Sequence, residues 1–198
     1  KLEIALKNFS KNIHKIEKDY DFSIRQTILN EARDLKIVAS NYHNRAYNNP
    51  ELLIYNLKNS MNKLAAKIQL EGGARVEGVA LIKAEQLLGK KIDKVTKIEK
   101  GSIYTKEKGG KQGEVLVLLE TYKELENYIS INSKFKINRQ DYYNDIKQAA
   151  LISREIAEGS HGLRWNFAKR RMFEYGKAGY SYSDSLQQVS YEMKHNRA

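Results

Sequence analysis

Apolar residues recur at helical spacing through most of the first ninety residues of the chain. Apolar positions separated by three or four residues place one hydrophobic face on a helix. The pattern predicts helices over residues 1–18, 23–43, 51–70 and 75–88. Two breaks interrupt it: Pro50, which is the only proline, and the pair Gly72 and Gly73.

The centre of the chain has a different pattern. Residues 92–119 are rich in valine and isoleucine and alternate in places, which is typical of strands. Residues 103–105 and 115–118 are the two predicted strands, and a basic, glycine-rich turn over 106–113 joins them. The sequence therefore predicts an antiparallel hairpin here.

The last third returns to helical periodicity. It predicts helices over 122–128, 140–156, 162–175 and 186–193, with a loop over 176–184. Ser183 or Asp184 is the expected N-cap of the last helix. The fold class predicted is mainly α with a small antiparallel β-sheet (α+β). Residues 46–198 form one domain in this interpretation, and residues 1–45 are a helical arm or the end of a preceding DNA-binding domain.

The charge of the chain indicates its partners. Lysine and arginine number 35 against 24 acidic residues, which gives a formal net charge of +11. A strongly basic domain most often binds a polyanion, with nucleic acid ahead of an anionic membrane surface. No apolar run approaches the length of a membrane span, and nothing resembles a signal peptide.

Cysteine is absent, which excludes disulfides and thiolate zinc sites. The four histidines are far apart in the sequence, so no metal site is expected. We expect no cofactor, and a reducing cytoplasm as the compartment.

One motif suggests chemistry. His161 and Arg164 are three residues apart, so on a helix they share a face. A phosphodiester needs such a pair, because arginine offers a bidentate cationic fork and histidine a titratable donor. An isolated pair of this kind is more often a solvated helix face.

Three more positions fit the same chemistry. Arg75 follows the two glycines at a predicted helix start, where backbone N–H groups also attract anions. Lys108 lies in the hairpin turn, and His195 ends the last helix. Taken singly, these are a surface arginine, a solvated turn lysine and a capping histidine.

Together these residues resemble the tyrosine recombinases, the family of phage integrase-like site-specific recombinases. The resemblance rests on GARV at 73–76, KGGK at 108–111, SHGLR at 160–164 and MKHNR at 193–197. These segments are similar to the family's first arginine turn, its lysine hairpin, its H-x-L-R box and its L-G-H box. The resemblance covers roughly residues 50–198.

The sequence departs from the family pattern at several places. Gly78 stands three residues after Arg75, where the family has an acidic residue, and Lys194 replaces the glycine before the histidine. Trp165 stands where histidine is common. No tyrosine follows His195. Either the polypeptide was cut before its nucleophile or the natural protein lacks one, and we expect the nucleophile beyond Ala198.

The resemblance implies site-specific DNA recombination, in the integration or excision of a mobile element or phage, through a 3′-phosphotyrosyl intermediate. It implies catalytic roles for five residues: Arg75, Lys108, His161, Arg164 and His195. The expected DNA contacts are made by Lys106, Lys111, Lys169, Arg170 and Arg171.

The expected partner is double-stranded DNA, bound on paired sites by a homo-tetramer of the full-length protein. Alternatives are a non-catalytic DNA-binding module and a type IB topoisomerase. A generic basic helical protein that binds RNA or membrane is a more remote alternative.

Overall fold

The computed structural model describes residues 44–195. The chain divides into two compact units, 1–44 and 45–198, and the elements described belong to the second. The helices predicted over 1–18 and 23–43, and the arm or preceding domain predicted for 1–45, lie outside the described residues.

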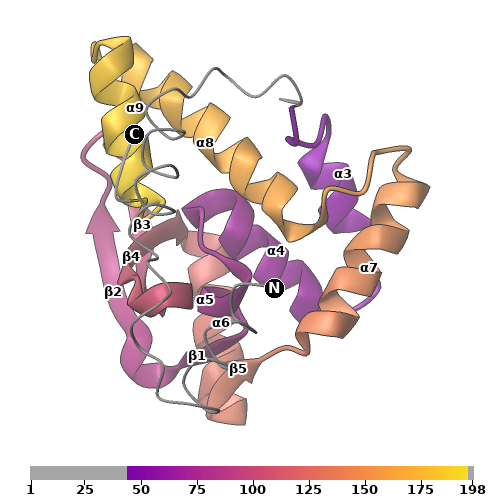
Figure 1. Ribbon diagram of the computed structural model, residues 1–198. Helices are drawn as coiled ribbons and strands as arrows, with labels where there is room; N and C mark the ends of the chain where they lie inside the picture. Colours follow the sequence, from indigo (N-terminus) through magenta and orange to yellow (C-terminus); the bar gives the residue numbers. More distant parts are fainter. Residues whose placement is uncertain (1–43, 196–198) are drawn as a thin grey trace, which may run out of the picture. The chain divides into compact units, whose positions relative to one another are not determined.

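Four helices pack together around one part of the core (Figure 1). They are α3 (Pro50–Tyr55), α4 (Ser60–Gly72), α7 (Arg139–Ile152) and α8 (Gly159–Lys177). Helix α4 packs along α8, while α7 contacts both α3 and α8. Leu53, Ile68, Ile146 and Leu163, one from each helix, are fully buried between them. The apolar stripes read from the sequence therefore face one common core.

The prediction of a single helix over 51–70 is wrong, because the structure has two helices there. Residues between Tyr55 and Ser60 leave the helix, and Asn59 caps α4 by accepting a hydrogen bond from the Met61 N–H (2.8 Å). The Asp145 carboxylate of α7 accepts the backbone N–H groups of Lys58 (3.0 Å) and Asn59 (3.2 Å). A distant side chain thus satisfies the backbone at the break.

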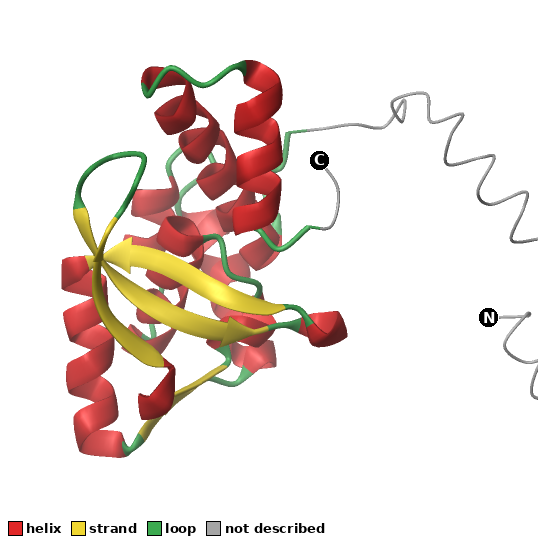
Figure 2. Cartoon of the chain, turned by 90° about the vertical axis from the view of Figure 1, so that its left-hand side faces the viewer, coloured by secondary structure: helices red, strands yellow, loops and turns green. Residues whose placement is uncertain are grey.

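The predicted hairpin is confirmed, within a larger sheet. Strands β2 (Leu87–Ile92), β3 (Glu99–Lys106) and β4 (Gln112–Leu118) form an antiparallel sheet in that order. Helix α6 (Leu119–Asn132) packs on this sheet, and Figure 2 shows the sheet on one side of the helices. A second, two-stranded sheet pairs β1 (Leu81–Lys83) with β5 (Lys134–Lys136).

The helix predicted over 75–88 is also wrong. Helix α5 covers only Val76–Val79, and β1, a 3₁₀ turn η1 (Ala84–Gln86) and β2 follow it. Within β1, Ile82 is buried while its neighbours are exposed, which is a strand pattern. Pairing of these residues with β5 and β3, which are distant in sequence, overrides the local helical spacing.

Helix α9 (Tyr182–Glu192) completes the domain and packs against α8. Its N-cap is Ser181, whose hydroxyl accepts the Asp184 N–H (3.1 Å), so the predicted cap at Ser183 or Asp184 is wrong. The fold is mainly α with small antiparallel sheets, as predicted. Among the described residues, no helix has the length and apolar character that a membrane span requires.

Candidate active site

Arg164 lies at the centre of the candidate site. It belongs to α8, and its side chain is only 2% exposed. Its Nη2 donates to the Met193 carbonyl (3.1 Å) and lies 3.4 Å from Nε2 of His195. Its Nε and Nη1 make no hydrogen bond among residues 44–195, although Nη1 lies 3.6 Å from a carboxylate oxygen of Glu107. Burial lowers the pKa of Arg164 to about 10, so the guanidinium stays cationic at neutral pH. The site therefore holds a buried cationic fork with donors to spare.

The end of α9 places His195 beside this fork. The Lys194 N–H donates to the Tyr191 carbonyl and the His195 N–H to the Ser190 carbonyl, both at 2.8 Å. Lys194 has a φ of 57°. This bonding pattern with a left-handed residue is the Schellman motif, which ends a helix by reversing the chain. The reversal carries His195 back toward α8.

Arg75 reaches the site through a glycine turn. Gly73 ends α4 in the left-handed region (φ 67°), and a Cβ there would come within 2.5 Å of the Phe167 ring. Only glycine allows α4 and α8 to approach this closely. Two residues later, Arg75 precedes α5, and its side chain is 29% exposed.

Glu107 connects these cations, and it was not among the site residues predicted from the sequence. Its side chain is fully buried at the end of β3. Its Oε1 accepts hydrogen bonds from Lys194 Nζ (2.8 Å) and the Arg75 N–H (3.2 Å). Its Oε2 lies 3.6 Å from both Arg75 Nε and Arg164 Nη1. One carboxylate therefore faces three cations. The signal available in the sequence was the glycine at position 78, where the family pattern has an acidic residue, together with the acidic Glu107 beside Lys108.

Both predicted histidines lie in the electric field of the arginines. His161 is in the first turn of α8. Burial and the charges of Arg164, Arg45 and Arg75 lower its pKa. Burial and the charges of Arg164 and Arg75 likewise lower the pKa of His195, and His161 contributes to that shift. Both imidazoles are therefore neutral at neutral pH.

Lys108 begins the turn η2 (Lys108–Gly110) at the tip of the hairpin. Its backbone lies beside Glu107, and its catalytic role stays a prediction. Gly109 and Gly110 have φ values of 77° and 72°, which glycine adopts without strain. Lys106 is exposed and Lys111 half-buried, on either side of the tip.

The three basic residues predicted on α8 have different surroundings. Lys169 is exposed, whereas Arg170 donates to the carbonyls of Leu70 (3.1 Å) and Glu71 (2.9 Å). Arg171 is 5% exposed. Its guanidinium hydrogen-bonds three carboxylates, those of Asp93, Glu174 and Glu192. We therefore assign Arg171 to the support of α9 and leave it out of the DNA surface proposed below.

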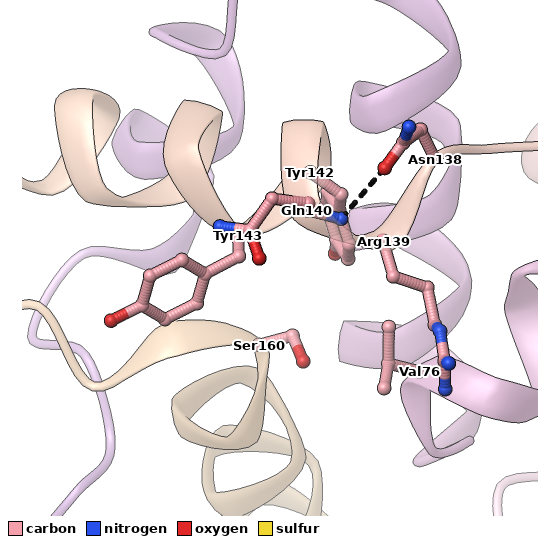
Figure 3. Close-up of a pocket in the computed structure, with 7 residues that line it drawn as sticks. All are labelled: Val76, Asn138, Arg139, Gln140, Tyr142, Tyr143 and Ser160. Atoms are coloured by element: carbon pink, nitrogen blue, oxygen red, sulfur yellow. Dashed lines mark hydrogen bonds between the residues drawn. The ribbon is translucent and has the colours of Figure 1, made fainter.

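A pocket of about 570 Å³ opens beside the site. It lies between the N-termini of α7 and α8 and the start of α5, and Val76 and Ser160 lining it are the sequence neighbours of Arg75 and His161 (Figure 3). The rest of its lining comes from the start of α7: Asn138, Arg139, Gln140, Tyr142 and Tyr143.

Among residues 44–195, no group of three histidine, cysteine or acidic side chains is arranged to hold a metal ion.

Solved structures resemble this chain. XerH site-specific recombinase bound to difH substrate, in a pre-cleavage complex, matches 98% of this chain and 57% of its own at 18% identity, with a TM-score of 0.58. The post-cleavage complex of XerH with palindromic difH matches 81% of this chain and 48% of its own, also at 18% identity, with a TM-score of 0.56. XerA recombinase matches 98% of this chain and 74% of its own at 13% identity, with a TM-score of 0.54.

The chain thus spans about half the length of the XerH chains that it matches. No protein-family model matches the sequence, and no curated protein matches it. At these identities the likeness concerns the fold. The chain therefore has a tyrosine recombinase-like fold, with the α+β architecture of that family's catalytic domain.

Proposed function

We propose that this chain is the catalytic domain of a site-specific recombinase that cleaves and rejoins DNA strands through a 3′-phosphotyrosyl intermediate. The observation that carries the proposal is the buried Arg164 fork. Its Nε and Nη1 make no hydrogen bond among the described residues, its Nη2 lies beside His195, and Arg75 approaches the same Glu107 oxygen that Nη1 faces. A buried cation of this kind suits the non-bridging oxygens of a phosphodiester.

In this proposal a tyrosine oxygen attacks the phosphorus and the bond to the 5′ oxygen breaks. Arg75 and Arg164 stabilise the negative charge that grows on the non-bridging oxygens, as preorganised donors do at developing charge. Lys108 gives its proton to the departing 5′ oxygen. His161 and His195 are neutral, so each can donate an N–H to the phosphate, and one of the two accepts the single proton that the tyrosine loses.

The proposed DNA surface surrounds this site. Lys106 and Lys111 flank the hairpin tip, and Lys169 is exposed on α8. The net charge of +11 adds a long-range attraction to phosphates. Binding to duplex DNA should therefore weaken steeply as salt rises. Assembly as a tetramer on paired sites is part of the proposal.

Covalent trapping tests the chemistry. The protein would carry its natural continuation through the proposed nucleophilic tyrosine, because the 198 residues contain no tyrosine after His195. It would be incubated with nicked suicide duplexes randomised around the nick, and covalent complexes would be separated on a denaturing gel and sequenced. A tyrosine-to-phenylalanine variant and Arg164→Ala are the controls, and both should abolish the covalent band.

Each result has a distinct meaning. Covalent complexes enriched in one DNA sequence support the recombinase. Covalent complexes without sequence preference favour a type IB topoisomerase. Salt-sensitive duplex binding with no covalent complex contradicts the proposed chemistry and leaves a DNA-binding module.

A further inference from the structure

The carboxylate of Glu107 lies against Gly78, on the short helix α5. A Cβ built on Gly78 would come within 3.1 Å of both Glu107 Cγ and Thr105 Cβ, and within 3.4 Å of Glu107 Oε1. A side chain at position 78 and the present side chain of Glu107 would therefore compete for the same space. Position 78 is also the place where the resemblance to recombinases leads one to expect an acidic residue.

We infer that Glu107 is a positioning residue for Arg75 and Arg164, and that it supplies from the hairpin the carboxylate that Gly78 lacks. The catalytic part of this inference rests on the proposed function. The contacts of Glu107 with the two arginines do not depend on that function. Because Glu107 is the sequence neighbour of Lys108, the same carboxylate also ties the hairpin tip to the two arginines.

Lys194 is the charge partner of Glu107. Its side chain is 8% exposed, and its Nζ donates to Glu107 Oε1 (2.8 Å) and to Thr105 Oγ1 (2.7 Å). These bonds occupy Oε1 and leave Oε2 facing the two guanidinium groups. Lysine is strained at a φ of 57°, a conformation that glycine adopts freely. The ion pair with Glu107 explains why a lysine occupies this glycine-type position.

Moving the carboxylate from position 107 to position 78 tests the inference, and the experiment uses the 198-residue chain. Glu107→Ala deprives three buried or half-buried cations of the carboxylate that they share, and we expect its melting temperature to fall by about 10 °C. It should also shift the ¹⁵N–¹H resonance of Arg164 Nε, identified by its loss in Arg164→Lys. Gly78→Glu alone should lower the melting temperature, because the new side chain meets Glu107.

The double variant Gly78→Glu/Glu107→Ala is decisive. We expect it to regain at least half of the lost melting temperature and to return the Arg164 resonance toward its original position. The matched control is Glu114→Ala, which removes a carboxylate of the same hairpin that pairs with Lys91 and Ser102. That variant should leave the Arg164 resonance in place, and Gly78→Glu should not rescue it.

Additive losses in the double variant, or an unchanged Arg164 resonance in Glu107→Ala, would overturn the inference. If Glu107→Ala does not fold, Glu107→Gln replaces it and Lys194→Met is the second change. The pair Glu107→Gln/Lys194→Met should then melt at a higher temperature than Glu107→Gln alone, and an equal or lower value would contradict the pairing. These measurements involve no DNA, so a failed trapping experiment overturns the proposed function without deciding this inference.

Discussion

Nη2 of Arg164 lies 3.4 Å from Nε2 of His195, although the two residues are 31 positions apart. The same Nη2 also donates to the Met193 carbonyl, so Arg164 holds the end of α9 as well as facing the site. The position of His195 and the position of the arginine fork therefore depend on each other.

Arg164→Lys should retain the positive charge and lose the fork. Lysine offers one ammonium in place of two parallel N–H donors, so it cannot hold two phosphate oxygens and the Met193 carbonyl in the same geometry. We expect single-turnover cleavage of a suicide duplex to slow by about 100-fold or more. Duplex affinity at fixed salt should change by less than about threefold, since surface lysines supply most of it. Equal losses in affinity and rate would contradict a role of the fork at the reacting phosphate.

His195 should titrate with a pKa below its ordinary value, and this pKa should rise in Arg164→Gln. Burial and the charge of Arg164 both lower this pKa, and the variant removes the second cause. An NMR titration of the imidazole Cε1 proton measures the change, with Arg170→Gln as the control because that arginine hydrogen-bonds carbonyls of α4.

The lowered pKa of His195 also makes the stability of the fold depend on pH. A histidine with a lowered folded-state pKa binds its proton more readily in the unfolded chain. Its contribution to stability is full above the unfolded pKa of about 6.5 and declines as the pH falls toward the folded value. A His195 pKa that stays the same in Arg164→Gln would contradict the electrostatic contact.

Arg171→Met should destabilise the fold. The Arg171 side chain is 6% exposed, and its removal leaves the carboxylates of Asp93, Glu174 and Glu192 without their shared cation. We expect a loss of about 3–5 kcal/mol in the free energy of unfolding, measured in urea. Lys169→Met, on the exposed face of the same helix, should change it by less than about 0.5 kcal/mol. Similar losses in both variants would refute the structural role of Arg171.

Arg171→Met should also reduce how much the stability of the fold falls at acidic pH. Burial raises the pKa of Asp93, but hydrogen bonds from Arg171 and Lys100 outweigh it and hold that pKa below its ordinary value. Stability from this carboxylate is therefore present above a pH of about 4 and is lost as the pH falls below it. Unfolding curves at pH 6 and pH 3 should differ less in Arg171→Met than in the original protein.

Gly73→Ala should destabilise more than Gly179→Ala. Both glycines have positive φ values, 67° and 88°, so both variants carry the cost of a left-handed alanine, about 1–2 kcal/mol. Only at Gly73 does the new Cβ also meet a neighbour, the Phe167 ring at 2.5 Å, whereas nothing lies within 4 Å at Gly179. The difference between the two losses, from thermal unfolding, should be at least about 1 kcal/mol. Equal losses would mean that the ring moves away freely.

The hairpin, most of the helical segments of the core and the residues that carry the proposed chemistry were predictable from local pattern. Alternation of valine and isoleucine around a glycine-rich turn specified β3 and β4, and the spacing of His161 and Arg164 specified one helix face. These features depend on residues that are close in sequence, which is why periodicity finds them. The break between α3 and α4 and the strands β1 and β2 were missed, because Asp145, β5 and β3 determine them from far along the chain.

The site divides in the same way. By itself, the sequence determined which cations were available, the order in which they occur, and the departures at Gly78 and Lys194. Only the tertiary structure decided that Glu107 fills the space in front of Gly78, that Lys194 pairs with it, and that Arg171 is buried away from the surface. The physical reason is that a buried charge is tolerated where an opposite charge meets it, and in this fold the opposite charges come from segments that only folding brings together.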